Sequence, residues 1–389
     1  MPGGERRVEG HHPTSRMRST RATITDVARQ AGVSKATVSA VLNDSGAVKS
    51  TTRERVLAAI DLLNYRPAAV AGRQHARRGR CLALLVKEID NPYYGELVLG
   101  ARDHAEANGY TLLVASSEGS FASERRAVEL LQAMGADGLL ATPVLDDQAD
   151  LSHFYELKRR NFPFVLLEDV RGVRASLVDV DNAEASRRAV VHLIEQGHVR
   201  IAHFAGPAYS MHTQERLDGV RRACSASALI FGDADVVEAG AHLEDGYRAG
   251  LAYFRDRPAA ERPTAVTCYN DLLAIGLCRA LAELGLRVPH DVSVVGFDDL
   301  PLAEYLPVPL TTVAMPKRRM GAMAAEMLIR HVEAAESLPP RKVLLDAELV
   351  VRASTRPPAV GGAATAPADA LPAPRRAPRG RAASPGTPR

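Results

Sequence analysis

Several features of membrane, secreted and metal-binding proteins are absent from this 389-residue chain. It has no uninterrupted apolar run of about 18 residues or more, the length expected of a membrane-spanning helix. The first twenty residues are polar and basic without the apolar stretch of a secretory signal, so we expect a cytoplasmic protein. Four cysteines lack the paired CxxC spacing of zinc sites, which predicts core thiols and no metal centre.

The common signatures of enzymes are also missing. The chain has no GxSxG nucleophile motif, no HExxH metalloprotease motif and no phosphate-binding GxGxxG or P-loop. Its twelve histidines are scattered, and His11 and His12 fall in a polar N-terminal stretch. We therefore expect a protein that binds its ligands without catalysing a reaction and without a cofactor.

Charge is distributed unevenly along the chain. Residues 1–80 contain 15 Lys and Arg against 6 Asp and Glu, and residues 357–389 contain 5 Arg against 1 Asp. Because the overall net charge is only +3, the segment between them is acidic. A basic segment attracts the phosphate backbone of nucleic acid, and an acidic one is repelled by it. This asymmetry predicts DNA binding through the N-terminal segment, with an affinity that falls steeply with salt.

The segment TITDVARQAGVSKATVSAVLN, residues 23–43, predicts two short helices joined by a tight turn. Thr23 is suited to cap the first helix, and Asp26 completes a capping-box pattern. Ser34 is suited to cap the second helix, with Thr37 at its third position. Two helix starts eleven residues apart leave room for about two turns of helix and a bend.

Small and apolar residues in this segment have the spacing of a helix-turn-helix. Ala28 lets two helices touch, Gly32 permits a turn with positive φ, and Val38 points into a small core. An ordinary pair of packed helices would show the same spacing. The DNA-binding interpretation is favoured by the exposed residues of the second helix, which are short or cationic and suited to phosphate oxygens and base edges: Lys35, Thr37, Ser39 and Asn43.

The central segment, residues 81–355, alternates short apolar runs with longer amphipathic stretches. This alternation is typical of parallel sheets covered by helices on both faces. LVLGARDHAEANG and SRRAVVHLIEQGH have helical spacing, and Gly197 in the second is expected just beyond the end of its helix. The predicted strands end in small, polar or acidic residues, which are candidates for a binding site at the carboxyl edge of a sheet. They are CLALLV, YTLLVAS, DGLLATP, FPFVLLE, VRIAHFAGP, PTAVTCYN and VSVVGFDD.

Several motifs occur together in the order found in one family of regulators. They are TITDVARQAGVSKATVS, LNYRP, NPYYGELVLGARDHAEANGY, HLIEQGHVRIAHFAGP, ERLDGV, NDLLAIG, DVSVVGFDD, PLTTV and ELVVRAST. Through these motifs, over about residues 20–355, the chain resembles transcriptional repressors of the lactose and galactose repressor (LacI/GalR) family. The resemblance implies a small all-α helix-turn-helix headpiece, a hinge, and a two-lobed α/β core like that of periplasmic binding proteins. It also implies a homodimer on a pseudo-palindromic operator in double-stranded DNA.

Composition and resemblance together divide the chain. The Pro-, Ala- and Arg-rich C-terminal tail cannot bury enough apolar surface to fold, and the polar N-terminal extension precedes an alternative start at Met17. The expected boundaries are 1–19 for a disordered extension, 20–66 for the headpiece, 67–79 for the hinge, 80–356 for the core and 357–389 for a disordered tail. Within the core we expect lobe 1 at about 80–180 and 311–340, and lobe 2 at about 181–310 and 341–356.

The resemblance also implies which residues meet DNA. Lys35, Ala36 and Ala40 would face base edges, with Lys35 donating to guanine and the alanines offering methyl contact. In the hinge, Gln74 occupies the position where the family usually has a leucine wedge, so kinking of the operator is in question. Arg73 is still suited to the minor groove or its phosphates, and a plain basic linker is the alternative.

An effector pocket between the lobes is a further implication of the resemblance. Carboxylates with Arg and Asn between them suit a polyhydroxylated ligand such as a sugar or nucleoside, because each hydroxyl both donates and accepts. Gln214 and Ala241 stand where relatives often have another arginine and an aromatic lid, so no known ligand can be carried over. The expected effector-binding residues are Tyr93, Tyr94, Glu168, Arg216, Asn270 and Asp298.

Other functions are compatible with parts of this pattern. A regulator of the same fold that responds to a corepressor or a protein partner would also fit Gln214 and Ala241, and a screen of sugars against the core would separate the two. A solute-binding transport protein would share the core but not the headpiece. Release from DNA on ligand binding is the expected response, because induction is the commoner behaviour in the family.

Overall fold

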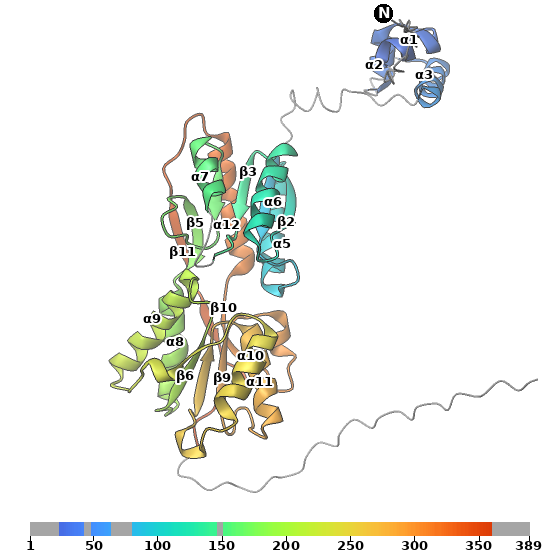
Figure 1. Cartoon of the computed structure of the whole chain (residues 1–389). Coiled ribbons are helices and arrows are strands. Elements are labelled where there is room, and N and C mark those ends of the chain that lie inside the picture. Colours follow the sequence, from blue (N-terminus) through green and yellow to red (C-terminus); the bar gives the residue numbers. More distant parts are fainter. Residues whose placement is uncertain (1–22, 43–47, 64–79, 146–150, 360–389) are drawn as a thin grey trace, which may run out of the picture.

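The structure is a computed structural model that describes residues 23–42, 48–63, 80–145 and 151–359. The expected N-terminal extension, the hinge and nearly all of the expected C-terminal tail lie outside the described residues, as do Asn43, Arg73 and Gln74. Figure 1 shows a small helical unit and a core of two stacked α/β lobes. The predicted fold class is therefore confirmed.

The headpiece consists of helices α1 (Ile24–Ala31), α2 (Lys35–Leu42) and α3 (Ser50–Leu62). Their facing sides form a small apolar core, and α3, which the sequence had not predicted, closes it against the first two helices. A core of this size suits a module that presents one helix rather than one that encloses a ligand. Its buried residues are Val27, Ala28, Ala31, Val38, Val41, Val56 and Ala59.

The caps of the first two helices follow the predicted pattern. The backbone N–H of Thr23 donates to Asp26 Oδ2 at 2.9 Å. The backbone N–H of Thr37 donates to Ser34 Oγ at 3.1 Å. Gly32 has φ +62° between the helices, a conformation that costs glycine little. The predicted helix starts and turn are thus confirmed.

Lobe 1 is built on a parallel sheet with strand order β11-β5-β4-β3-β1-β2. Helices α5 and α12 cover one face of it, and α6 and α7 cover the other. Its strands are β1 (Cys81–Val86), β2 (Thr111–Ser116), β3 (Gly138–Ala141), β4 (Phe164–Leu166), β5 (Ser176–Val180) and β11 (Lys342–Leu345). Its helices are α5 (Pro92–Ala107), α6 (Phe121–Ala133), α7 (Ser152–Arg159) and α12 (Lys317–Glu333).

Lobe 2 repeats this arrangement with strand order β12-β10-β9-β8-β6-β7, parallel except for the β10–β12 pair. Helices α8 and α9 cover one face, and α10 and α11 the other. Its strands are β6 (Ile201–Ala205), β7 (Val236–Glu238), β8 (Ala265–Cys268), β9 (Ser293–Asp298), β10 (Thr311–Ala314) and β12 (Glu348–Val350). Its helices are α8 (Asn182–Glu195), α9 (Met211–Ala226), α10 (Leu243–Phe254) and α11 (Asp271–Glu283), with short 3-10 helices at Asp233–Asp235, Ala259–Glu261 and Pro301–Glu304.

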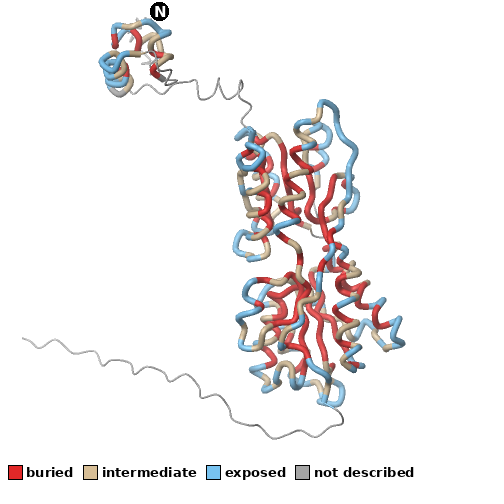
Figure 2. The backbone as a smooth tube through the Cα atoms, turned by 180° about the vertical axis from the view of Figure 1, so that it is seen from behind, coloured by how far each residue is buried: buried red, intermediate tan, exposed pale blue. Residues whose placement is uncertain are grey.

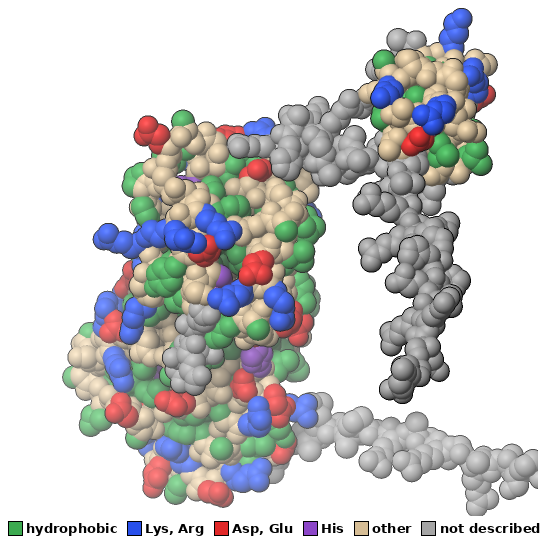
Figure 3. Space-filling view, turned by 45° about the horizontal axis from the view of Figure 1, so that its top comes forward, with side chains coloured by type: hydrophobic (Ala, Val, Ile, Leu, Met, Phe, Trp, Pro, Cys, Tyr) green, Lys and Arg blue, Asp and Glu red, His purple; other side chains and the backbone are tan. Residues whose placement is uncertain are grey.

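Burial follows the layers of each lobe. Figure 2 shows buried strands running through the middle of both lobes, with the exposed residues on the outer sides of the helices and in the loops. In Figure 3, Lys and Arg side chains are interspersed with Asp and Glu over the visible face of the core, so neither sign of charge dominates that face. Among the described helices, none combines the length and apolar character needed to span a membrane.

The chain crosses between the lobes three times, and two crossings differ from the expected ones. The first, after β5, agrees with the expected boundary near residue 180. The second was expected near 310, but β10 pairs in parallel with β9 and so belongs to lobe 2. The third was expected near 340, but β11 pairs in parallel with β5 in lobe 1. Each strand completes its sheet before the chain crosses, so both boundaries fall a few residues later than expected.

Candidate functional site

A cavity of about 200 Å³ lies between the two lobes. Its walls come from residues at or just after the carboxyl ends of β1, β3 and β4 in lobe 1 and of β6, β8 and β9 in lobe 2. This is the edge at which parallel sheets bind ligands. The structure brings all six predicted effector-binding residues to this cavity: Tyr93, Tyr94, Glu168, Arg216, Asn270 and Asp298.

Glu168, two residues after the end of β4, is buried and contacted by groups from both lobes. Lys87, directly after β1, forms an ion pair with it. From lobe 2, Ser210 Oγ donates to Glu168 Oε1 at 2.9 Å, and His212 Nδ1 lies 3.9 Å from the same oxygen. Burial raises the pKa of Glu168, but the charges of Lys87 and His212 and the hydrogen bonds from Lys87 and Ser210 outweigh it and lower the pKa to about 2. Glu168 is therefore ionised, and both of its oxygens are engaged by the protein.

His212 makes a second buried contact between the lobes. Its Nε2 lies 2.9 Å from Oδ2 of Asp179, which belongs to β5 in lobe 1. Burial lowers the pKa of His212, but the carboxylates of Asp179 and Glu168 outweigh this and raise it. We call Lys87, Glu168, Asp179, Ser210 and His212 the bridging cluster. Its positive and negative charges are paired with one another.

Arg216, on α9, is buried and held by neutral groups rather than by a carboxylate. Its Nε donates to Asn182 Oδ1 at 3.0 Å, and its Nη1 donates to the carbonyl of Tyr269. The guanidinium lies 3.7 Å from the centroid of the Phe297 ring. A guanidinium carries five N–H groups, so donors remain that a ligand oxygen in the cavity can use.

Asn270 shapes the cavity as the N-cap of α11. Its Oδ1 accepts from the backbone N–H of Leu273 at 2.8 Å, and its Nδ2 donates to the carbonyl of Ala241 at 2.8 Å. The side chain thus ties the start of α11 to the segment before α10. One N–H of the amide group remains for a ligand.

Asp298 ends β9 in an unusual backbone conformation, with φ +118°. Asp299 follows with φ +53°, so two consecutive non-glycine residues adopt positive φ. Lys317, at the start of α12, donates to the carbonyls of both residues, the second at 3.0 Å. Asp271 accepts from the backbone N–H of Leu300 at 2.7 Å. Strain of this kind is retained where surrounding contacts hold it, frequently at binding sites. We call residues 298–300 the Asp298 turn.

The carboxylate of Asp298 differs sharply from that of Glu168. Burial raises its pKa to about 6, although the charges of Arg216, Lys317 and His212 act in the opposite direction. In the described part of the chain, no group donates a hydrogen bond to its carboxylate oxygens, and the side chain lines the cavity. Asp298 is therefore an acceptor that the protein leaves open.

Tyr93 and Tyr94 form an apolar wall at the first turn of α5. Asn91 caps this helix by accepting from the Tyr93 N–H at 3.0 Å. The two rings lie edge to face, with centroids 5.1 Å apart and planes at 86°. Burial raises the pKa of both phenols well above the usual value, so both are neutral.

The described part of α2 presents the side chains expected to meet DNA. Lys35 and Ala36 are exposed, whereas Val38 is fully buried against the other helices. Thr37, Ser39 and Ala40 are half-buried along the helix. The Thr37 hydroxyl lies 2.9 Å from Ser34 Oγ, which fixes it near the helix start.

The sequence matches two family models. Residues 23–68 match bacterial regulatory proteins of the lacI family, and residues 190–355 match a periplasmic binding protein-like domain. The repressor PurR of Photobacterium profundum is 34% identical over 341 residues, covering 86% of this chain and 99% of the relative. PurR of Vibrio vulnificus is 35% identical, covering 85% and 98%.

The chain belongs to the LacI family.

Solved structures agree with this membership. The structure of a transcriptional regulator CelR–cellobiose complex is 33% identical in sequence, with a TM-score of 0.65. The match covers 86% of this chain and 100% of that one. The structure of a lac repressor dimer bound to operator and the anti-inducer ONPF is 28% identical, with a TM-score of 0.67. The match covers 87% of this chain and 100% of that one. As a LacI-family protein, the chain is a DNA-binding transcriptional repressor with a helix-turn-helix headpiece, and its relatives are repressors rather than enzymes.

Sequence reasoning missed the partners of Glu168 in this LacI-family cleft. Lys87, Ser210 and His212 were not among the predicted site residues, and neither was Asp179. A signal was present for Lys87, which directly follows a predicted strand, and a weaker one for Ser210, three residues beyond the end of another, at the edge where parallel sheets bind ligands. His212 lies inside α9 and carried no such signal. Asp179 carried no such signal, since it lies inside β5, a strand that was not predicted.

Proposed function

We propose that this LacI-family repressor acts in the cytoplasm, binds a pseudo-palindromic operator as a homodimer, and is released by a small uncharged polyhydroxylated ligand in the cavity between its lobes. The observation that carries the proposal is the environment of Asp298. Its carboxylate lines the cavity without a donor from the described protein, beside the buried guanidinium of Arg216. An acceptor and a donor so arranged suit adjacent hydroxyls of a sugar or nucleoside.

The charges of the cleft favour a neutral ligand. Lys87 is paired with Glu168, and His212 with Asp179, so these four groups offer no unpaired charge to a ligand. Arg216 and Asp298 bring one charge of each sign. The cavity of about 200 Å³ is smaller than the roughly 300–1,000 Å³ typical of sites for drug-sized molecules, which favours a compact ligand. A regulator solved as a cellobiose complex is 33% identical to this chain, which supports the sugar class.

Dimerisation is supported by the small size of the headpiece. A single α2 of this length reads few base pairs, and two-fold symmetry doubles the recognised sequence. The related lac repressor was solved as a dimer on its operator. We propose that Lys35, Ala36 and Ala40 read base edges. The remaining contacts, to the backbone or minor groove, would come from Thr37, Ser39, Asn43, Arg73 and Gln74.

The ligand would act by favouring one arrangement of the lobes. Tyr93, Tyr94 and Glu168 belong to lobe 1, whereas Arg216, Asn270 and Asp298 belong to lobe 2, so one ligand would contact both. A ligand shifts such an equilibrium only through its difference in affinity for the two arrangements. A typical coupling of about 1–3 kcal/mol would change operator affinity by about 5- to 150-fold.

Fluorescence anisotropy on DNA upstream of the protein's own gene tests the proposal directly. Full-length protein would be titrated at two salt concentrations, with and without cellobiose, D-glucose, D-ribose and adenosine. We expect selective, salt-sensitive binding that one compound weakens, and no such weakening in Asp298→Asn. Selective binding that no compound changes would refute the ligand part, and no selective binding would refute the operator part. Lys35→Ala should relax selectivity at one base pair per half-site, at a cost of about 1–3 kcal/mol.

Control by a corepressor or protein partner is the second candidate, and the bridging cluster favours it. Both oxygens of Glu168 are engaged by Lys87 and Ser210, so the lobes are joined without any ligand. A regulator whose lobes are held together in this way could respond to a partner on its surface. A solute-binding transport protein is disfavoured by the lacI-family match at residues 23–68.

A further inference from the structure

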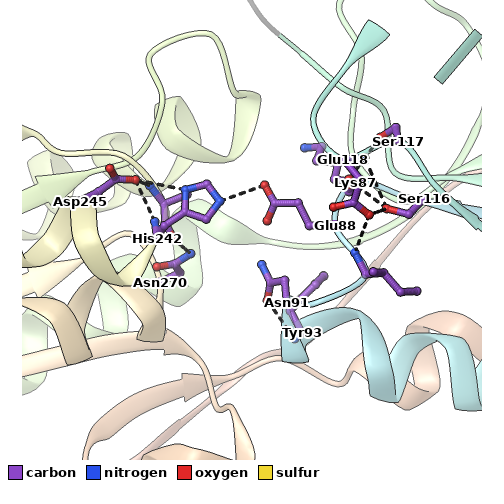
Figure 4. Close-up of polar contacts among 12 residues, drawn as sticks. Lys87, Glu88, Asn91, Tyr93, Ser116, Ser117, Glu118, His242, Asp245 and Asn270 are labelled. Atoms are coloured by element: carbon purple, nitrogen blue, oxygen red, sulfur yellow. Dashed lines mark hydrogen bonds and ion pairs between the residues drawn. The ribbon is translucent and has the colours of Figure 1, made fainter. Parts of the chain in front are cut away.

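A polar contact outside the bridging cluster also joins the two lobes at the cavity. Glu88 follows β1 in lobe 1, and His242 directly precedes α10 in lobe 2. His242 Nε2 lies 2.9 Å from Glu88 Oε1, and both residues line the cavity. Figure 4 shows the imidazole and the carboxylate pointing toward each other across the space between the lobes. Neither residue belongs to a segment that crosses between the lobes, so this contact can break while the chain connections stay intact.

The imidazole is oriented from its other side by Asp245. His242 Nδ1 lies 3.1 Å from Asp245 Oδ2, and the backbone N–H groups of Ala241 and His242 donate to the same oxygen at 3.2 and 3.1 Å. Arg248 Nη2 donates to Asp245 Oδ1 at 3.1 Å and holds the carboxylate in place. His242 is thus presented to lobe 1 by a built turn rather than by a free surface rotamer.

Both ring nitrogens of His242 face carboxylates, and this sets a requirement on its protonation. A neutral imidazole has one N–H and can donate to only one carboxylate, whereas the protonated ring donates to both. The neutral ring would place a lone pair against either Glu88 or Asp245. The geometry therefore needs the protonated form to satisfy both contacts.

The segment that carries His242 is also tied to a predicted ligand contact. Residue 241 is alanine, so no large side chain covers this side of the cavity, and its carbonyl accepts from Asn270 Nδ2 at 2.8 Å. Movement of His242 would therefore be felt at Asn270. The Glu88–His242 contact therefore lies at a part of the cavity wall where residue 241 contributes no large side chain.

We propose that Glu88 and His242 form a latch that closes the cleft and opens when His242 loses its proton. The inference rests on the cleft being the effector site, as proposed above, but not on the identity of the ligand. Closure by the latch would strengthen ligand binding when His242 is protonated and weaken it when the ring is neutral. The repressor would then respond to a pH change together with its ligand.

The charges around His242 favour its protonated form, which is the form that the latch requires. Burial lowers its pKa, but the hydrogen bonds and charges of Glu88 from lobe 1 and Asp245 from α10 outweigh this and raise it. Arg248 faces Asp245, and Lys87 faces Glu168, so neither cation is paired with Glu88. Because the folded pKa is raised, the latch is complete below the ordinary pKa of histidine and is lost as pH rises through the raised value.

The expected effect is modest, because the contact is partly hydrated. The His242 side chain is 56% exposed and that of Glu88 is 25% exposed. Exposed pairs of this kind change an equilibrium by about 2- to 5-fold and weaken in high salt. A change of that size in the closed fraction is large enough to measure.

The first test needs no ligand. Full-length protein labelled with [13Cε1]-histidine would be titrated by NMR, with the His242 signal assigned by its loss in His242→Gln. We expect Glu88→Gln to lower the pKa of His242, and Asp90→Asn, a nearby exposed carboxylate, to leave it unchanged. An unchanged pKa in Glu88→Gln would overturn the latch.

Hydrogen exchange of the same proteins reports cleft opening. After correction for the intrinsic pH dependence, wild-type protein should show more exchange in residues 87–94 and 208–214 at pH 8.5 than at pH 6. Glu88→Gln and His242→Gln should show a smaller difference between the two pH values, and the part that remains comes from other groups such as His212. A pH effect of wild-type size in both variants would overturn the latch. These two measurements test the latch even if no compound of the panel releases the protein from its operator. That outcome would refute the proposed ligand and leave the latch unaffected.

Discussion

Glu168 and Asp298 line the same cavity in opposite electrostatic environments. Glu168 is contacted by Lys87, Ser210 and His212, and its pKa falls to about 2. Asp298 has no donor on its carboxylate among the described residues, and its pKa rises to about 6. Both are buried, so burial alone does not explain the difference. The difference lies in whether nearby donors satisfy the charge.

This contrast assigns different tasks to the two sides of the cleft. The bridging cluster forms hydrogen bonds between lobe 1 and lobe 2, so it stabilises one relative arrangement of the two lobes. The Asp298 turn leaves a carboxylate unsatisfied and keeps a strained backbone, so it gains most when a ligand donates to it. Changes in the first region should therefore alter stability, and changes in the second should alter ligand response.

The largest expected effect is on stability, in Glu168→Gln. The substitution leaves Lys87 and His212 without their shared counter-charge, and breaking a buried pair costs about 3–5 kcal/mol of unfolding free energy. Because the folded pKa of Glu168 is lowered, its contribution is present above its ordinary value of 4.5 and should be lost as pH falls toward about 2. Urea unfolding of the full-length protein measures the loss. Glu129→Gln, an exposed position on α6, is the matched control.

An unchanged free energy of unfolding in Glu168→Gln would contradict the contrast between Glu168 and Asp298, because the bridging cluster would then contribute nothing to stability. A destabilisation of similar size in Glu129→Gln would mean that the loss of any carboxylate is felt, and would point away from the pair.

The next largest effect should be on ligand response, in Asp298→Asn. Hydrogen bonds to charged groups are worth about 1.5–3 kcal/mol, so affinity for the releasing ligand should fall by about 10- to 150-fold. Operator affinity without ligand should stay at the wild-type value, because the turn is far in sequence from the headpiece. Anisotropy with each compound of the panel measures both, with the exposed Glu304→Gln as control. Normal release in Asp298→Asn would remove Asp298 from the proposed site.

A smaller effect, opposite in sign to that of Glu168→Gln, is expected on the stability of Asp298→Asn. The raised pKa means that the native state keeps the proton to higher pH than the unfolded state does. Wild-type protein therefore loses stability relative to the Asn variant as pH rises from the ordinary value of 3.8 through about 6. Above pH 6 the variant should melt about 2–4 °C higher for each kcal/mol gained, and the gap should close near pH 4. Calorimetric melting scans across this range provide the check, and a gap that widens toward low pH would contradict the assignment.

The sequence predicted the regular parts of this molecule better than the contacts that distinguish the two carboxylates. All seven predicted strands are present, and Gly197 adopts φ +96° as expected. The strands that were missed include three at sheet edges, β7, β11 and β12, which are only three or four residues long. Short edge strands carry little apolar signal, because one side of each is open to solvent.

The six predicted effector residues meet at one cavity because strand ends in parallel sheets share an edge. Their individual environments could not be predicted in the same way. The pairing of Lys87 with Glu168 joins residues 81 positions apart, and that of His242 with Glu88 joins residues 154 apart across the lobes. The first contact depends on the strand order within lobe 1 and the second on how the lobes meet, and no local sequence pattern records either.

The smallest expected effect concerns the support of the Asp298 turn, in Lys317→Met. Lys317 donates to the carbonyls of Asp298 and Asp299 and brings a buried positive charge near the Asp298 carboxylate. Its loss should relax the strained turn and raise the pKa of Asp298 further. Because Lys317 acts on the ligand only through this turn, ligand affinity should fall by about 2- to 5-fold, which corresponds to under about 1 kcal/mol. The low-pH limb of ligand binding should also move to higher pH. Lys317→Arg keeps the charge and should preserve that limb. If the two variants bind ligand alike at every pH, the charge of Lys317 does not act on Asp298, and the contrast with Glu168 rests on the missing donors alone.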